Sequence, residues 1–161
     1  MIMIPPIMEK LLILKLLLEN WRNGLQTTVA QNVLDEKNIL AQILVRMSDL
    51  PEFVGLSPIT TTTKGNFGNT PLHVAAVWGD AQAIHLLVKN GANIDAHGEY
   101  GYTPLHEAVE QRQMAAIETL ISLGASLDSR NSDGQNAQDL ASLIEWDDGI
   151  KFFKKIARRA E

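Results

Sequence analysis

Histidine and carboxylate side chains are the residues of this chain that could carry out chemistry. Two of the four histidines, His73 and His106, stand in the same local sequence, Thr-Pro-Leu-His, 33 residues apart. Imidazole can bind zinc or exchange a proton near neutral pH. Glu107 and Glu110 are spaced one helical turn apart and could pair a general acid with a general base. These patterns raise the possibility of a metal centre or of acid–base catalysis.

Residue types exclude several of these chemistries. The chain has no cysteine, so it can form neither a disulfide framework nor a thiolate metal site. It has no Gly-x-Ser-x-Gly sequence, and the glycine-containing residues 65–68 lack the Lys-Ser/Thr of a phosphate-binding loop. Solvated or partner-facing positions explain the carboxylates better than catalysis does. We therefore expect a protein that is not an enzyme and needs no metal, cofactor or small-molecule substrate.

The histidines belong to a longer repeat. Residues 70–75, Thr-Pro-Leu-His-Val-Ala, return as residues 103–108, Thr-Pro-Leu-His-Glu-Ala, and the glycines at 68 and 91 return at 101 and 124. A third, degenerate copy begins at Gly134, with Asn136 standing 33 residues after Thr103. Self-similarity at a fixed period of this length indicates a stack of structural repeats.

The residues that carry this period resemble those of the ankyrin-repeat family, from about Gly65 to the C-terminus. The resemblance implies an all-α ankyrin-repeat solenoid of helix-turn-helix repeats with short β-hairpin loops. It also implies that the motif histidines hydrogen-bond the backbone between adjacent repeats. Stacking would then place them about 10 Å apart, too far to share a zinc ion. The positions that carry the repeat frame are Thr70, Pro71, Leu72, His73, Gly91, Thr103, Pro104, Leu105, His106 and Gly124.

The expected organisation is one domain with a helical cap before the repeats. Residues 65–97 and 98–130 form clear repeats, and residues 131–161 form a degenerate C-terminal one. Residues 1–64 show no copy of the motif, so we interpret them as an irregular helical N-terminal capping segment. It should contain one helix at Leu11 to Leu18 and another from about Gln31 to Met47. Such a cap would cover the apolar end of the stack.

The apolar start of the chain does not match a targeting signal. Lys15 interrupts the run from Leu11 to Leu18, and no small-residue cleavage site follows it. No uncharged stretch approaches the roughly 18 residues of a spanning helix. We expect a cytoplasmic monomer with no membrane association.

Charge is concentrated in the two clear repeats. The whole chain has a net charge of −5, and residues 65–135 contain three Lys/Arg against eight Asp/Glu, which is the same −5. Such a surface repels nucleic acid and favours a basic protein partner. The alternative is a solvated acidic surface that only aids solubility. A cluster of five Lys/Arg near the C-terminus leaves nucleic-acid binding as a less favoured reading.

Positions that the repeat frame does not need are candidates for partner binding. Four of the nine aromatic residues fall there, together with acidic residues. Trp and Tyr are common anchors of protein interfaces, and an acidic rim would attract a basic partner. The expected partner-binding residues are Phe67, Asn69, Val77, Trp78, Glu99, Tyr100, Tyr102, Glu110, Gln111 and Asp133. Packing against the cap is the alternative role for Trp78, and packing along the hairpins is the alternative for Tyr102.

The sequence therefore predicts a non-catalytic protein-binding module. One specific hypothesis is a stoichiometric inhibitor, such as a bacterial immunity protein that neutralises a basic toxin or enzyme. The alternative is an intracellular regulatory adaptor that docks on a signalling or transcription protein. A nucleic-acid binder acting through the C-terminal basic helix is the third hypothesis.

Overall fold

The computed structural model describes Glu19, Arg22 and residues 31–160. The chain divides into two compact units, Met1–Ile39 and Leu40–Glu161. In the first unit, residues 31–39 are helical. The helix expected at Leu11 to Leu18 lies outside the described residues.

The second unit is built from short helices, and no strand is found in residues 40–160. Residues 40–48 are helical and precede the repeats. The later elements are η1 (Pro51–Phe53), α2 (Pro71–Trp78), α3 (Ala81–Lys89), η2 (Glu99–Gly101), α4 (Pro104–Glu110), α5 (Met114–Ser122), α6 (Ala137–Leu143) and α7 (Asp147–Ala160). The expectation of an all-α fold is confirmed for the described residues.

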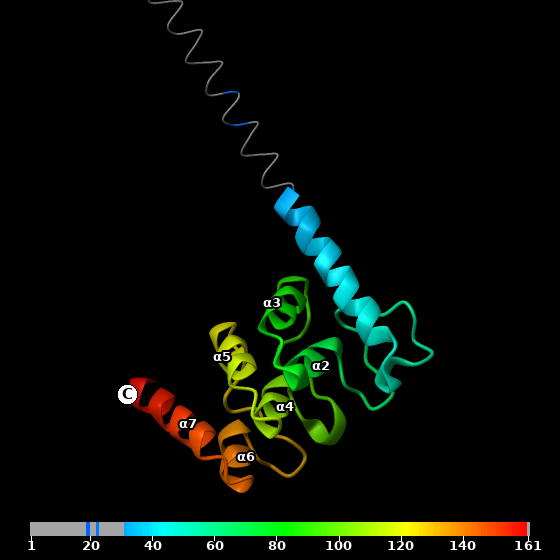
Figure 1. Cartoon of the computed structure of the whole chain (residues 1–161). Coiled ribbons are helices and arrows are strands. Elements are labelled where there is room, and N and C mark those ends of the chain that lie inside the picture. Colours follow the sequence, from blue (N-terminus) through cyan, green and yellow to red (C-terminus); the bar gives the residue numbers. More distant parts are fainter. Residues whose placement is uncertain (1–18, 20–21, 23–30, 161) are drawn as a thin grey trace, which may run out of the picture. The chain divides into compact units, whose positions relative to one another are not determined.

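The helices pair in sequence and stack in two layers (Figure 1). The first helices of the repeats, α2, α4 and α6, pack side by side, and α3 packs on α5 in the second layer. Fully buried alanines on the first helices let these neighbours approach closely, while leucine and isoleucine fill the space between the layers. The main core residues are Leu72, Ala75, Ala76, Ile84, Leu87, Leu105, Ala108, Ile117, Leu120, Leu140 and Ala141.

Local sequence explains where the first helices begin and end. Thr70 and Thr103 have extended backbones and cap helices whose first residue is proline, which needs no N–H partner there. Gly79 ends α2 in the left-handed conformation, with φ of 71°. In the next repeat Arg112 occupies the equivalent position and keeps φ at 55°, as does Glu145 at 52°. The backbone of the turn is therefore conserved between repeats although glycine is not.

The loops between repeats are tight turns, each closed by one backbone hydrogen bond. The N–H groups of Gly65, Gly98 and Asn131 donate to the carbonyls of Asn69, Tyr102 and Gln135, respectively, at 2.7–2.9 Å. These three turns follow one another at the 33-residue period. They supply the hairpin-like tips that the sequence predicted.

The degenerate third copy folds like the other two. Asn136 stands where Thr70 and Thr103 stand, and its side chain accepts from the N–H of Asp139 at 2.9 Å. Asp139 accepts in return from the N–H of Asn136 at 3.2 Å. This reciprocal pair is a capping box, so Asn and Asp replace Thr and His without loss of the helix start.

Candidate functional site

The two motif histidines link each repeat to the next. The Thr70 N–H donates to His73 Nδ1 at 3.0 Å, and His73 Nε2 lies 3.0 Å from the Tyr102 carbonyl. His106 repeats this pattern with Thr103 and with the Gln135 carbonyl. Because Nδ1 accepts, the ring proton must be on Nε2, where it is donated to the carbonyl.

Burial keeps both rings neutral. It lowers the pKa of His73 from 6.5 to about 4, and it also lowers the pKa of His106. Both nitrogens of each ring are occupied by hydrogen bonds within the protein, so neither histidine is available to a metal. Among the residues that the structure describes, no group of His, Asp and Glu could hold a metal ion.

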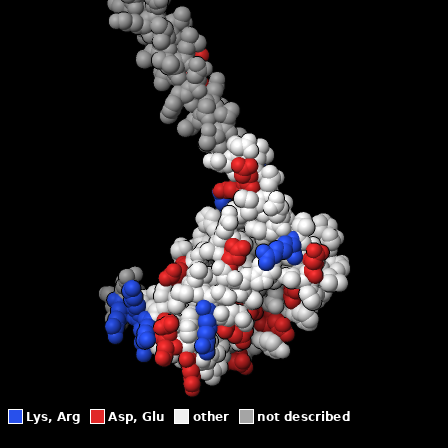
Figure 2. All heavy atoms as spheres, viewed as in Figure 1, with Lys and Arg blue, Asp and Glu red and all other residues white. Residues whose placement is uncertain are grey.

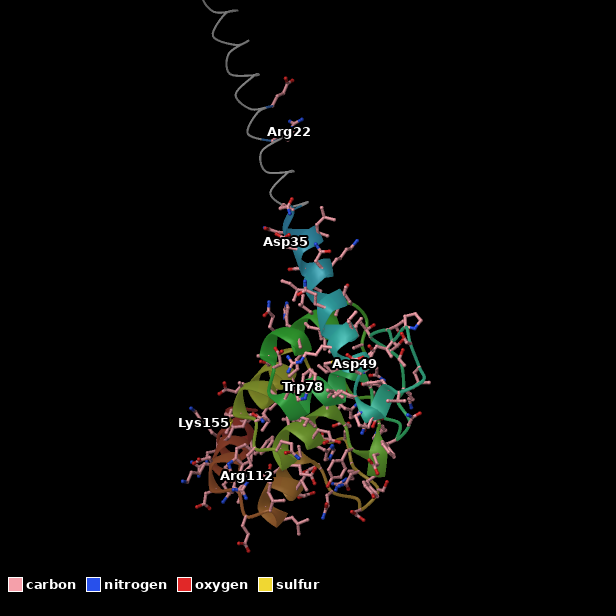
Figure 3. All side chains as sticks on the ribbon, turned by 45° about the vertical axis from the view of Figure 1, so that its right-hand side comes forward. Arg22, Asp35, Asp49, Trp78, Arg112 and Lys155 are labelled. Atoms are coloured by element: carbon pink, nitrogen blue, oxygen red, sulfur yellow. The ribbon has the colours of Figure 1, made fainter. Side chains whose placement is uncertain are left out.

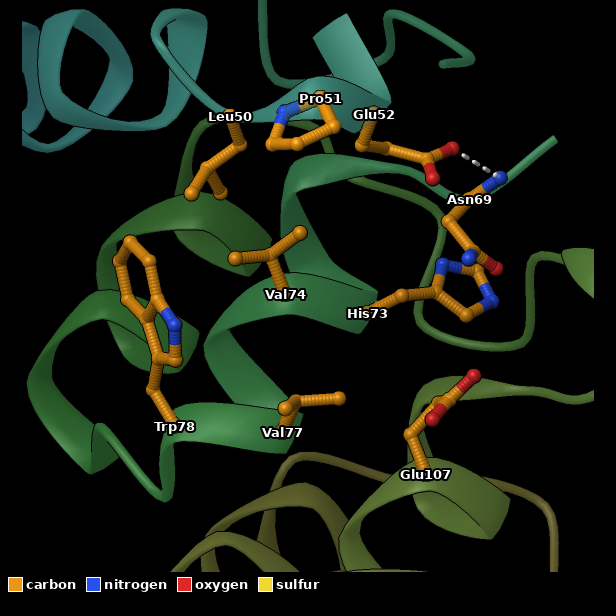
Figure 4. Close-up of a pocket in the computed structure, with 9 residues that line it drawn as sticks. All are labelled: Leu50, Pro51, Glu52, Asn69, His73, Val74, Val77, Trp78 and Glu107. Atoms are coloured by element: carbon orange, nitrogen blue, oxygen red, sulfur yellow. Dashed lines mark hydrogen bonds between the residues drawn. The ribbon is translucent and has the colours of Figure 1, made fainter. Parts of the chain in front are cut away.

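A pocket of about 270 Å³ opens between the segment before the first repeat and the first helices of the two clear repeats (Figure 4). One wall is Leu50 and Pro51, and α2 supplies the apolar side chains of the facing wall. Polar groups are gathered at the end where α4 and the first hairpin meet it. The full lining is Leu50, Pro51, Glu52, Asn69, His73, Val74, Val77, Trp78 and Glu107.

The two carboxylates of the pocket have different surroundings. Glu52 Oε1 accepts from the N–H groups of Phe67 and Asn69, both at 3.2 Å, and so ties η1 to the first hairpin. Glu107 is half-buried on α4. Within the described residues it has no hydrogen-bond or ion-pair partner. Its carboxylate extends toward the space bordered by Val77 and His73 (Figure 4).

Burial raises the pKa of Glu107 from 4.5 to about 7, and the neighbouring carboxylates Glu110, Glu99 and Glu52 raise it further in the same direction. At neutral pH this group is therefore poised between its two protonation states. A cation placed in the pocket would favour the charged form.

Three of the residues expected to bind a partner line this pocket: Asn69, Val77 and Trp78. Trp78 is half-buried on α2, within the body of the second unit (Figure 3), and the Arg46 guanidinium lies over its ring at 4.3 Å. The ring thus packs against the segment before the repeats, which was the alternative considered for it, and still borders the pocket.

The other expected residues lie outside the pocket. Tyr100 and Phe67 are the most exposed aromatics of the hairpin tips, at 73% and 58% of their surfaces. Tyr102 is half-buried and its ring centroid lies 5.5 Å from that of His106, so it packs along the stack. The remaining expected residues are exposed or half-buried on the second repeat and third hairpin: Glu99, Glu110, Gln111 and Asp133.

Sequence reasoning missed Val74 and Glu107, which occupy equivalent positions in the first and second repeats. Both stand inside the six-residue motif, which was assigned entirely to structure. A signal was present, because the fifth residue is the one position at which the two copies of the motif differ. Leu50, Pro51 and Glu52 were also missed, since the segment that carries them has no repeat period.

Charge is separated along the second unit. Acidic side chains predominate over the repeats, whereas basic ones gather at α7 (Figure 2). There Lys151, Lys154, Lys155 and Arg158 line a shallow surface depression. Lys155 extends outward at the edge of the molecule (Figure 3). The acidic pocket and this basic helix therefore offer different surfaces to a partner.

Membrane insertion finds no support in the described helices, because none of them joins sufficient length to sufficient apolar character to span a bilayer.

Comparison with known proteins gives one family. The family model described as ankyrin repeats (3 copies) matches residues 36–131, more than half of the chain. The match begins upstream of Gly65, where the resemblance was expected to start, and therefore includes η1 and its pocket residues. No curated protein matches the chain.

Proposed function

The chain belongs to the ankyrin-repeat family, whose repeats are protein–protein interaction modules, and from this premise we propose that it binds a basic partner protein without catalysis. The binding surface consists of the pocket between α2 and α4 and the neighbouring hairpin tips. This surface contains Phe67, Asn69, Val77, Trp78, Glu99, Tyr100, Tyr102, Glu110, Gln111 and Asp133, which the sequence singled out, together with Val74 and Glu107.

The observation that carries this proposal is the unpaired Glu107 carboxylate beside an apolar wall. A half-buried charge without a partner costs stability, and here neighbouring acids add to the cost. A basic partner would remove that cost on binding. The excess of acidic residues in the repeats would also speed association with a partner of opposite charge.

The specific form that we propose is stoichiometric inhibition of a basic enzyme, as in a bacterial immunity protein that neutralises a toxin. An acidic, concave surface is suited to covering a basic active site such as that of a nuclease. A regulatory adaptor would use the same surface, but its partner would stay active in the complex. The two roles therefore differ in what binding does to the partner.

A capture experiment from the native source tests the proposal. Wild-type protein should retain a basic protein that the double variant Trp78→Ala, Tyr100→Ala loses, because these changes remove an aromatic from each part of the surface. Val54→Ala is the matched control, since Val54 is an exposed apolar residue outside the pocket lining. Circular dichroism should show that all three proteins are folded. Equal recovery by wild type and double variant would contradict the proposed surface.

The activity of the captured partner separates the two roles. If it is an enzyme, titration with the wild-type protein should abolish its activity at one equivalent under the inhibitor hypothesis. Unchanged activity in a saturated complex would instead establish the adaptor.

The basic residues of α7 support a different candidate, nucleic-acid binding. Asp147 and Asp148 in the first turn of the same helix oppose it. Fluorescence anisotropy with a labelled duplex would reveal binding that weakens steeply with salt if this candidate were correct. We expect no such binding at physiological salt.

A further inference from the structure

The pocket between α2 and α4 has the dimensions of a site for one side chain. Its volume of about 270 Å³ is below the roughly 300–1,000 Å³ of pockets that hold small molecules. One end is apolar, with Val74 and Val77 on α2 opposite Leu50. The other end presents the Glu107 carboxylate. An occupant should therefore be an elongated side chain with an apolar stem and a cationic head.

Lysine and arginine both have this form, and the structure favours arginine. The Trp78 ring already attracts one guanidinium, that of Arg46, at 4.3 Å. Guanidinium is planar, is more weakly hydrated than ammonium, and can donate two parallel hydrogen bonds to one carboxylate. Glu107 can accept such a pair because both of its oxygens lack partners within the described residues. Glu52 is less suitable, since its Oε1 already accepts from two backbone N–H groups.

We propose that this pocket accepts one arginine side chain of a basic partner protein, with the guanidinium on the Glu107 carboxylate and the methylene stem against Val74 and Val77. This inference rests on the proposed function and names the residue type through which the partner is recognised. Arginine is among the residues that most often dominate the binding energy of interfaces when they fill such a pocket.

The titration of Glu107 supports the same arrangement. Its pKa is raised to about 7 by burial and by Glu110, Glu99 and Glu52, which lie on α4, the second hairpin and η1. His73 faces the pocket from α2 and is neutral in this range because its own pKa is lowered to about 4. A bound guanidinium would lower the pKa of Glu107, so arginine should bind more tightly at pH 8 than at pH 6.

A nuclear magnetic resonance titration with capped arginine, Nα-acetyl-arginine methylamide, tests the pocket directly. We expect saturable shifts of the Trp78 indole N–H and of the Val74 and Glu107 amides, with a dissociation constant on the order of millimolar. Capped citrulline, which has nearly the same shape without the charge, should bind at least about tenfold more weakly. Capped lysine should also bind more weakly than capped arginine.

Two variants with the same change of charge locate the effect. Glu107→Gln should weaken arginine binding about tenfold or more. Glu118→Gln removes an exposed carboxylate on α5 outside the pocket and should leave binding unchanged. Absence of shifts up to tens of millimolar arginine, or equal losses in both variants, would overturn the proposal. Lysine binding as tight as arginine would overturn the preference for a guanidinium.

Failure of this inference can be told apart from failure of the proposed function. If a basic partner is captured and loses affinity in the Trp78→Ala, Tyr100→Ala variant but not in Glu107→Gln, the surface is correct and the arginine pocket is wrong. If the double variant loses nothing, the proposed surface itself is wrong.

Discussion

The first helices of the two clear repeats have the same scaffold and different exposed faces. In α2 the motif histidine is followed by Val74, Val77 and Trp78, and at the equivalent positions of α4 stand Glu107, Glu110 and Gln111. Both helices begin at Thr-Pro, bury the same leucine, histidine and alanine, and pack against each other. The difference teaches that structure fixes one set of positions and leaves the other to recognition. One helix gives the pocket its apolar wall and the other gives it a charge.

The shared positions should respond alike in both repeats. His73→Ala and His106→Ala each leave a buried N–H and a carbonyl without partners and create a cavity. We expect each to lower the free energy of unfolding by about 3 kcal/mol. Urea denaturation followed by circular dichroism measures the loss. If either variant lost less than about 1 kcal/mol, the histidine would not be the link between repeats that the geometry indicates.

The variable positions should differ in their effect on partner affinity. Trp78→Ala removes an aromatic wall of the pocket and should cost about 2 kcal/mol of binding free energy, roughly 30-fold in dissociation constant. Gln111→Ala, at the equivalent exposed position of α4, should cost less than about 0.5 kcal/mol. Calorimetric titration with the captured partner measures both. Similar losses in the two variants would mean that the apolar wall and the exposed face contribute equally, contrary to this account.

Removing the charge at Glu107 should stabilise the fold in a pH-dependent way. A carboxyl whose pKa rises from 4.5 to about 7 on folding lowers stability as pH rises through that interval. His73, whose pKa falls from 6.5 to about 4, lowers stability as pH falls through its own interval. The two slopes oppose each other in the wild type, whereas Glu107→Gln keeps only the histidine slope.

We therefore expect Glu107→Gln to unfold with about the same free energy as wild type at pH 4.5. At pH 8 it should be more stable by about 1 kcal/mol, after allowance for solvent screening. Urea denaturation at intervals between these two values gives the curve, with Glu118→Gln as the exposed control. A difference that does not vary with pH would show that Glu107 ionises normally in the folded protein.

The smallest predicted effect concerns the turns that follow the two helices. Gly79 and Arg112 both have positive φ, which favours glycine over residues with a side chain. Arg112→Gly should raise the free energy of unfolding by about 0.5 kcal/mol, because relief of strain exceeds the loss of an exposed hydrogen bond to the Ile144 carbonyl. Gly79→Ala should lower it by about 1 kcal/mol. Thermal unfolding of the pair would contradict the interpretation if the arginine variant were the less stable.

Much of the scaffold could be predicted from sequence because it depends on local rules that recur every 33 residues. Thr-Pro at a helix start and glycine at a helix end require no knowledge of the tertiary structure. The same logic identified Trp78 and Val77 as positions that the repeat leaves free. It also anticipated the left-handed backbone at Arg112, although not at Glu145, which lies in the degenerate copy.

The pocket could not be predicted in the same way. Leu50 and Glu52 come from a segment without a period, so nothing in the sequence places them opposite α2. The unusual state of Glu107 arises from its burial and from carboxylates on η1 and the second hairpin, which are brought near by folding alone. The family match shows the repeat framework, while the residues that would choose a partner lie at the positions that vary within it.

The most direct test of the account measures stability and partner affinity together for Glu107→Gln at pH 8. A structural carboxylate would lose both when replaced, and an unimportant one would change neither. The account predicts that the variant unfolds with a higher free energy than wild type and binds the captured partner at least about tenfold more weakly. Unchanged affinity in a variant that is more stable would contradict the claim that the carboxylate serves recognition.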